Sequence, residues 1–184
     1  MMENKITILR TTRLALRPLQ IGDVEALHRI YQYDGVLRYF PNPIPPPLEK
    51  VERFIASQQG HWEKFGYGNW GILPEGEQVI VGWAGLQFIP ELNETEVGFL
   101  FEPRCWGKGY ATEVARASLQ FGFERANLDH IIALVHPDNI ASRRVIEKCE
   151  MQYQETIFLW GIDLMRFRLS FRPEHGPVQD EPGT

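Results

Sequence analysis

Residues 96–113 read EVGFLFEPRCWGKGYATE, and the fold of the chain follows from this stretch. Its first part alternates as a strand does, its middle is a turn with two glycines, and its last part begins a helix. A helix start presents unpaired N–H groups and the positive end of the dipole, which together can hold an anion. Gly107 and Gly109 remove side chains where a pyrophosphate would approach the backbone, and Arg104 and Lys108 add positive charge.

Two common phosphate-binding loops do not match this stretch. A Walker-type loop needs Ser or Thr after its lysine, but Gly109 follows Lys108, and no second glycine precedes the lysine at the required spacing. A dinucleotide-binding fingerprint needs three glycines, and this turn has two. The pattern alone also leaves open a glycine turn that only packs a helix against a strand.

The remaining chain divides into strands and helices by the period of its apolar residues. Strands are predicted at residues 12–19, 68–73, 78–88, 95–101, 131–135, 153–159 and 163–171. Helices are predicted from the candidate N-cap Asp23, after Pro47, at 109–126 and at 140–149. The order β-α-α-β-β-β-α-β-α-β-β predicts one α+β domain over residues 1–172, with a mixed sheet and a flexible C-terminal tail at 173–184.

Two segments add detail to this outline. Helix 109–126 carries a stripe of small residues that would let it lie close against a sheet, namely Ala111, Ala115, Ser118 and Gly122. Residues 41–47 read PNPIPPP, which excludes both a helix and a central strand because proline lacks an N–H and fixes φ. This proline run is interpreted either as a wall of a binding site or as a stiff spacer.

Composition and charge exclude several classes of protein. The 184 residues carry 19 Lys and Arg against 24 Asp and Glu, and this net charge of −5 disfavours nucleic-acid binding. No apolar run approaches the ~18–20 residues of a membrane span, and the first residues lack the apolar core of a secretory signal. The two cysteines, Cys105 and Cys149, fit a reducing cytoplasm, and no zinc-binding motif is present.

Several separated blocks resemble one family. Arg104, Gly107 and Gly109 have the spacing of the (Gln/Arg)-x-x-Gly-x-(Gly/Ala) acetyl-CoA signature of the GNAT N-acetyltransferases. The blocks TRLALRPL, EVGF, WGKGYATE and the pair Asn139 and Ser142 resemble its RimJ/RimL branch, which includes acetyltransferases of ribosomal-protein N-termini. The resemblance spans about residues 10–171 and keeps the order of the family.

The resemblance implies a GNAT fold, with a mixed, mostly antiparallel central sheet flanked by helices. Its fourth and fifth strands, here 95–101 and 131–135, would splay apart and hold the pantetheine arm of acetyl-CoA between them. The amides from Cys105 to Ala111 would bind the pyrophosphate. The implied cofactor-binding residues are Phe99, Leu100, Phe101, Arg104, Cys105, Trp106, Gly107, Lys108, Gly109, Tyr110, Ala111, Asn139 and Ser142.

The implied catalytic residues are Glu96 and Ser142. Glu96 would act as the base for the amine, directly or through water, and strand alternation puts it on one face with Gly98. Ser142 would protonate the leaving thiolate, because Ile146 stands where many GNAT enzymes carry a tyrosine acid. The competing interpretations are a solvated carboxylate for Glu96 and a helix-capping hydroxyl for Ser142.

Other residues receive weaker assignments. His136 is a further candidate base, although packing is the more common role of a single histidine. The aromatic middle of the chain is expected to be mostly core, with one or two rings, and also Tyr39 and Phe40, lining the acceptor pocket. Glu150 replaces the glycine that usually ends the last helix of the family, at a cost of about 1 kcal/mol if its backbone is left-handed.

The function that the resemblance implies is an acetyl-CoA-dependent N-acetyltransferase. It would move an acetyl group to a primary amine, a protein N-terminus or a small amine, by direct attack in a ternary complex. A GNAT-fold module that binds acyl-CoA with little transfer, and a transferase for another acyl-CoA such as succinyl-CoA, are the alternatives. The expected partners are acetyl-CoA and an amine acceptor, without nucleic acid, membrane or metal, for a cytoplasmic monomer or homodimer.

Overall fold

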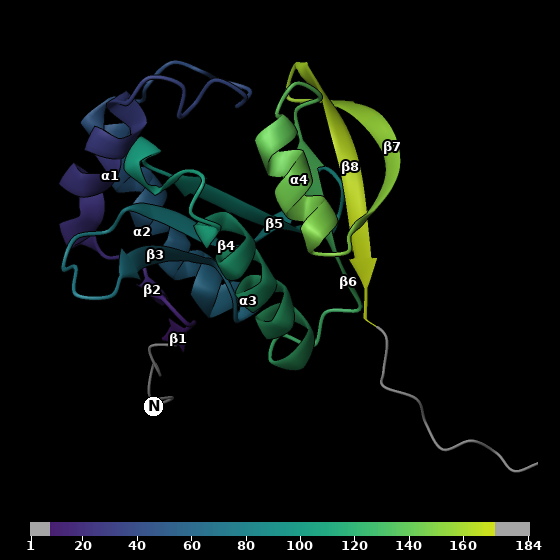
Figure 1. The fold of residues 1–184 in the computed structure, drawn as a ribbon, viewed down its shortest axis with the longest axis horizontal. Coiled ribbons are helices and arrows are strands. Elements are labelled where there is room, and N and C mark those ends of the chain that lie inside the picture. The colour runs from purple at the N-terminus through teal and green to yellow at the C-terminus, as the bar shows by residue number, and fades with distance from the viewer. Residues whose placement is uncertain (1–7, 172–184) are drawn as a thin grey trace, which may run out of the picture.

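The structure is a computed structural model that describes residues 8–171, and within this range one eight-stranded sheet forms the centre (Figure 1). Its strand order is β1-β2-β3-β4-β5-β6-β8-β7. The strands are β1 Leu9–Arg10, β2 Leu14–Pro18, β3 Asn69–Pro74, β4 Gly82–Ile89, β5 Glu94–Phe101, β6 His130–Val135, β7 Gln152–Leu159 and β8 Ile162–Ser170. The tail expected at residues 173–184 lies outside the described range.

The strand directions confirm a mixed, mostly antiparallel sheet. The pair β5–β6 is parallel, and the other neighbouring strands are antiparallel. The flanking helices are α1 Val24–Gln32, α2 Leu48–Phe65, α3 Tyr110–Glu124 and α4 Ile140–Lys148, with short 3₁₀ turns at Ile21–Asp23 (η1) and Pro103–Cys105 (η2). In Figure 1, α1 and α2 lie on one side of the view, α4 with β6, β8 and β7 on the other, and α3 between them.

The small-residue stripe brings α3 close to the sheet, as the sequence predicts. Ala115 and Ser118 are fully buried, and the Ser118 hydroxyl donates to the carbonyl oxygen of Val114 at 2.8 Å. A Cβ on Gly122 would lie 2.5 Å from Ile131 Cδ1 and 2.9 Å from Leu86 Cδ1. A larger residue here would have to displace these side-chain ends, so glycine lets α3 pack closely over β4 and β6.

One local expectation is wrong, and a second is confirmed only in part. Residues 78–81 do not belong to β4, which begins at Gly82, although Ile80 is buried against α1 and α2. Asp23 occupies the N-cap position of α1, as expected, but its side chain does not cap the helix. Its buried carboxylate instead accepts hydrogen bonds from the Arg17 guanidinium at 2.6 and 2.7 Å and from the N–H of Gln20 at 2.8 Å.

The end of α4 bears out the expectation for Glu150. Its φ is 62°, in the left-handed region. The N–H of Met151 donates to the carbonyl oxygen of Ile146, and the N–H of Glu150 donates to that of Glu147. These two bonds form a Schellman motif, which glycine favours at this position.

Replacing Glu150 with glycine is therefore expected to stabilise the protein by about 1 kcal/mol, since a non-glycine residue in this conformation costs roughly that amount. The corresponding rise in melting temperature is about 2–4 °C for a chain of this size. Glu150→Ala is the matched control, because alanine keeps the Cβ and should not give this gain. An equal gain in both variants would contradict the backbone explanation.

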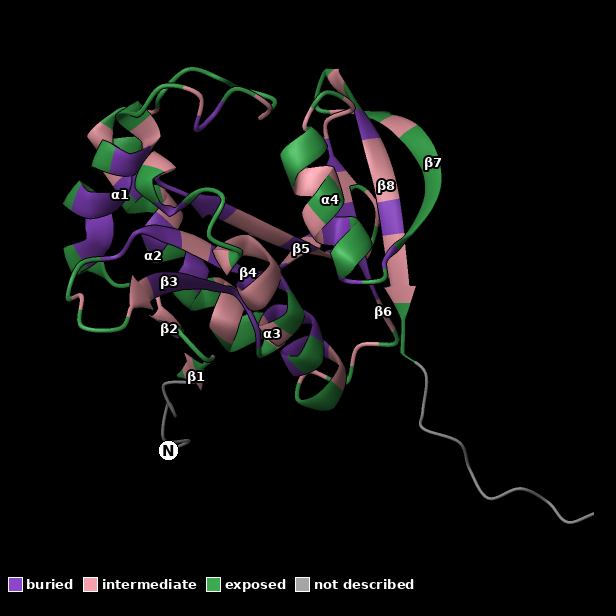
Figure 2. Cartoon of the chain, in the orientation of Figure 1, coloured by how far each residue is buried: buried purple, intermediate pink, exposed green. Residues whose placement is uncertain are grey.

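Strand β7 forms one edge of the sheet and is exposed along most of its length (Figure 2). Its pairing with β8 is shifted by a bulge between Tyr153 and Glu155. The hairpin tip that joins β7 to β8 contains Trp160 and Gly161, both with positive φ. Trp160 of this tip lines the candidate site described below.

Candidate active site

The glycine turn before α3 has the geometry of an anion-binding loop. Gly107 and Gly109 have φ values of 73° and 80°, and nothing lies within 4 Å of a Cβ built on Gly107. The first N–H groups of α3 have no intrahelical acceptor, and no side chain caps this end of the helix. The backbone is thus open to a ligand such as a pyrophosphate, and the residues present fit that group.

The amides of Cys105 and Trp106 are already used inside this turn. The N–H of Cys105 donates to Glu102 and that of Trp106 donates to Pro103, each at 3.0 Å. The Cys105 side chain is buried, and this burial raises the pKa of its thiol. Gly107 and the residues after it, rather than Cys105 and Trp106, are therefore the proposed donors to the pyrophosphate.

Arg104 holds the turn in place. Its guanidinium bonds both carboxylate oxygens of Glu77, at 2.8 and 2.5 Å, and also Glu102. The same contact holds the pKa of Glu77 below its ordinary value. These two ion pairs offset the charge of Arg104 and tie the turn to the β3–β4 connection. Lys108, by contrast, has no ion pair with residues 8–171.

Strands β5 and β6 part after residue 96, along the end of β5 that leads into the turn. Their register joins a single pair of residues, Glu96 with Ile132. The N–H of Glu102 donates to the carbonyl oxygen of Val81 at 2.9 Å, so Glu102 directs its backbone toward β4. Backbone groups of successive strand residues point to opposite sides, so Phe99 and Phe101 direct theirs into the space between β5 and β6.

The two faces of β5 differ as strand alternation predicts. Leu100 packs with Ile30, Val36 and Leu37 beneath α1, whereas Val97 and Phe101 belong to the larger cluster beneath α3. Glu96 and Gly98 share the face of Leu100, and a Cβ on Gly98 would lie 3.3 Å from the Trp83 ring. The face that carries Glu96 is therefore the one covered by α1 and the loop after it.

Glu96 lies where β5 and β6 separate. Its Oε1 accepts a hydrogen bond from the N–H of Leu134 on β6 at 3.3 Å. Burial raises the pKa of the carboxyl group from 4.5 to about 7, and the bond from Leu134 opposes that rise. A carboxyl group with this pKa exchanges a proton near neutral pH, which suits a general base.

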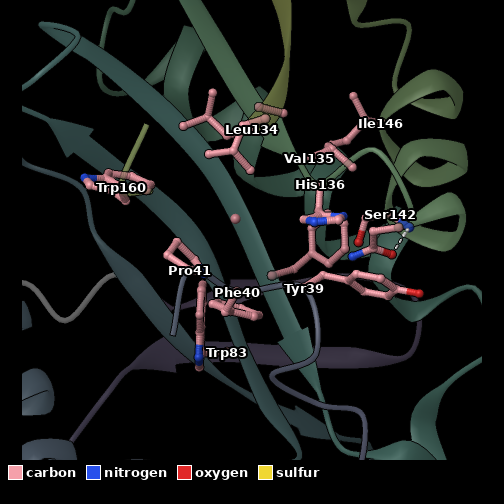
Figure 3. A pocket seen from close by; sticks show the side chains of 15 residues that line it. Tyr39, Phe40, Pro41, Trp83, Leu134, Val135, His136, Ser142, Ile146 and Trp160 are labelled. Carbon is pink, nitrogen blue, oxygen red and sulfur yellow. Dashed lines mark hydrogen bonds between the residues drawn. The ribbon is translucent and has the colours of Figure 1, made fainter. Parts of the chain in front are cut away.

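The start of α4 brings Asn139 and Ser142 together. Asn139 is the N-cap, and its Oδ1 accepts a hydrogen bond from the N–H of Ser142 at 3.1 Å, the dashed line in Figure 3. The capping group is thus Asn139, not Ser142. The Ser142 hydroxyl makes no hydrogen bond with residues 8–171 and lies at the pocket described next.

A pocket of about 120 Å³ lies between the diverging strands (Figure 3). On one side it is lined by Gly98 and Phe99 of β5 and by residues of β6 and α4, including Leu134 and Ser142. On the other side the walls are mainly aromatic, formed by Tyr39, Phe40, Pro41, Trp83 and Trp160. Glu96 does not line the pocket itself, but its partner Leu134 does.

The aromatic walls come from three separate segments. Trp83 is held by a hydrogen bond from its indole N–H to the Tyr31 hydroxyl at 3.1 Å, and Tyr31 is largely buried with its pKa raised to about 12. Trp160 donates to Glu91 at 3.0 Å, which ties the β7–β8 tip to the β4–β5 turn. Sequence reasoning did not single out Trp160, which lies between the predicted strands 153–159 and 163–171.

His136 lines the pocket, but the ring nitrogen that could accept a proton is already bonded. Its Nδ1 accepts a hydrogen bond from the N–H of Asp138 at 3.2 Å, so the proton of the neutral ring is on Nε2. The ring also packs on Tyr39 with centroids 5.4 Å apart. His136 therefore positions Tyr39 at the pocket, in line with the packing role.

Residues 8–171 contain no group of three or more His, Cys, Asp and Glu side chains that could hold a metal ion. Among the helices of this range, none combines the length and the apolar character needed to cross a membrane.

The strand separation, the glycine turn and the pocket occur together in a known family, and residues 13–152 match its acetyltransferase (GNAT) domain. The chain belongs to the GNAT acetyltransferase family. This assignment confirms the resemblance and the enzyme class, an acyltransferase. The uncharacterized N-acetyltransferase YnaD of Bacillus subtilis is 30% identical over 145 residues, which cover 78% of this chain and 82% of YnaD.

Solved structures extend the comparison. A GNAT acetyltransferase from Bacillus anthracis has a TM-score of 0.76 and 27% identity, covering 89% of this chain and 98% of its own. RimL, a ribosomal L7/L12 alpha-N-protein acetyltransferase in complex with coenzyme A, also has a TM-score of 0.76, with the same coverage of both chains. Its identity is 16%, so this second likeness concerns the fold alone.

Proposed function

We propose that this GNAT protein transfers an acetyl group from acetyl-CoA to a primary amine by direct attack in a ternary complex. One observation carries the proposal: a single pocket joins the open edge of β5, the Ser142 hydroxyl and the β6 residue that binds Glu96. When bound, acetyl-CoA would supply a thioester as the acetyl donor. The residues of the chain would bind the donor, align the amine and move the protons.

The donor side is the side of α3 and α4. The amides of Gly107, Gly109 and the first residues of α3 would hold the pyrophosphate, with Lys108 adding charge. The backbone groups of Phe99 and Phe101 face the space between the strands, where they can pair with the amides of the pantetheine arm. An N–H of this edge can also stabilise the negative charge that develops on the carbonyl oxygen.

The acceptor side is the aromatic side. Tyr39, Phe40, Trp83 and Trp160 would surround the amine-bearing group, because aromatic faces attract a cation before it loses its proton. Glu96 would take that proton, through a water molecule where contact is not direct. An α-amine, with a pKa of ~7.7–8.0, needs less help than a lysine side chain with ~10.4. Ser142 would donate a proton to the departing thiolate.

The test is a free-thiol release assay over peptides and small amines, run beside thermal melting with CoA. Acetyl-CoA should release thiol only when a suitable amine is present. CoA should raise the melting temperature, whereas ATP and NAD should raise it much less, because a ligand that selects the native state stabilises it. Melting shifts without amine-dependent thiol release would instead favour a CoA-binding module, and release from succinyl-CoA alone would favour another acyl group.

A further inference from the structure

Arg13 lies far from the glycine turn in sequence but binds it in the structure. It sits between β1 and β2, 95 residues before Lys108, and its side chain is 46% exposed. Its Nη1 donates to the carbonyl oxygen of Lys108 at 2.9 Å. Its guanidinium also lies over the ring of Tyr110, 4.7 Å from the centroid. These contacts join the N-terminal edge of the sheet to the residues on both sides of Gly109.

The contact with Lys108 fixes the direction of one amide. A trans peptide is planar, so its carbonyl oxygen and its N–H point in opposite directions. With the Lys108 oxygen held by Arg13, the N–H of Gly109 points away from Arg13 and into the open side of the turn. Gly107 and Gly109 both have positive φ, and glycine rotates more easily than other residues, so this peptide needs an external restraint.

The second contact concerns charge. Glu113 lies in the first turn of α3, where an ionised carboxylate would repel a pyrophosphate bound at the helix start. Arg13 covers this carboxylate: its Nε donates to Oε2 at 2.8 Å, and its backbone N–H donates to Oε1 at 2.9 Å. Partial burial raises the pKa of Glu113, but hydrogen bonds from Thr11 and from Arg13, with the charge of Arg13, hold it below its ordinary value. The charge of Glu113 is thus offset by Arg13 beside the turn.

We propose that Arg13 is a positioning residue for the coenzyme, acting through the Lys108–Gly109 peptide and through Glu113. It touches neither the reacting amine nor the acetyl group. The inference rests on the proposed function, since it assumes that the turn binds the pyrophosphate of acetyl-CoA. It assigns a role to a residue outside the signature Arg104-x-x-Gly107-x-Gly109.

The test compares Arg13→Ala and Arg13→Lys with a matched control, Arg116→Ala. Arg116 is also exposed and also donates to a backbone carbonyl, that of Lys148, at 2.7 Å, but it lies between α3 and α4. Calorimetric titration of CoA should give a Kd raised about tenfold or more for Arg13→Ala, the scale of one charge-assisted hydrogen bond. The Kd of Arg13→Lys should lie between those of the wild type and Arg13→Ala, and the Kd of Arg116→Ala should equal that of the wild type.

A second donor separates positioning from general damage. S-acetylpantetheine lacks the pyrophosphate, so its kcat/KM should be the same in Arg13→Ala and wild type. With acetyl-CoA, the KM of the donor should rise in Arg13→Ala while kcat at saturation stays unchanged. Wild-type CoA affinity in Arg13→Ala, or equal losses with both donors, would overturn the inference. Failure of the wild type itself to bind CoA would overturn the proposed function and the inference with it.

Discussion

Glu96→Gln is expected to lower kcat/KM at pH 7 by about 10²- to 10⁴-fold, the usual effect of removing a positioned general base. Glutamine keeps the shape of the side chain but cannot accept the proton of the amine. The loss should shrink as pH approaches the pKa of the amine, because solvent then deprotonates the substrate. The measurement is a pH–rate profile with one good acceptor, and full activity of the variant at pH 7 would place the base elsewhere.

Two comparisons make this result specific. Ser142→Ala should lower kcat without recovery at high pH, because its defect concerns the leaving group and not the amine. The Kd of CoA should stay near the wild-type value in Glu96→Gln, since Glu96 shares the face of β5 that α1 covers. In the wild type, kcat/KM should rise with pH through about 7, as Glu96 loses its proton.

The same substitution should also change stability with pH. Burial raises the pKa of Glu96 from 4.5 to about 7 in the folded state. Between these values the unfolded chain binds fewer protons than the folded protein, so this group lowers stability as pH rises. Above pH 7 the penalty reaches about 3 kcal/mol, at about 1.4 kcal/mol per pKa unit. Glu96→Gln should therefore raise the melting temperature at pH 8 and lose most of that gain at pH 5.

Gly109→Val is expected to abolish most of the stabilisation that CoA gives to the wild type, about 3 kcal/mol at a hundredfold excess over Kd. Gly109 has a φ of 80°, which a β-branched residue rarely adopts, and a Cβ there would lie 3.4 Å from the Arg13 guanidinium. The valine would both distort the turn and fill the space that a pyrophosphate needs. The measurement is the melting temperature with and without CoA.

Gly66→Val provides the matched control. Gly66 ends α2 with a φ of 74°, and nothing lies within 4 Å of a Cβ built there. This variant should lose stability by the same backbone strain and yet keep the full CoA-induced shift. A normal CoA shift in Gly109→Val would refute the assignment of the turn.

Local patterns allowed most of the fold to be predicted. The alternation of β2 and β5, the stripe on α3 and the glycines of the turn each act within a few residues, so each leaves a periodic or conformational signal. Residues 78–81 were misassigned because their β-branched residues are typical of a strand, and a loop that buries Ile80 against α1 and α2 has the same composition. The two-residue strand β1 is too short to leave any pattern.

The candidate site was predictable in part. The turn around Gly107 and the positions of Glu96 and Ser142 came from the family pattern, while their contacts did not. Ion pairs such as Arg104 with Glu77, and Arg13 with Glu113, join segments far apart in the chain. A charged residue reads as exposed in any local window, so such pairings have no local signal. The position of Trp160 at the pocket likewise has no local signal, because it depends on the path of the β7–β8 hairpin.

The exposed edge at β7 bears on aggregation between sheet edges. An edge strand offers unpaired backbone groups to the edge of another molecule. Phe158, which is 74% exposed, adds an apolar side chain at this edge. The bulge between Tyr153 and Glu155 twists this edge, and Gln152, Gln154 and Glu155 make it polar. A second sheet cannot align along β7 without an irregular register. The bulge thus acts against edge-to-edge aggregation, a task unrelated to acetyl transfer.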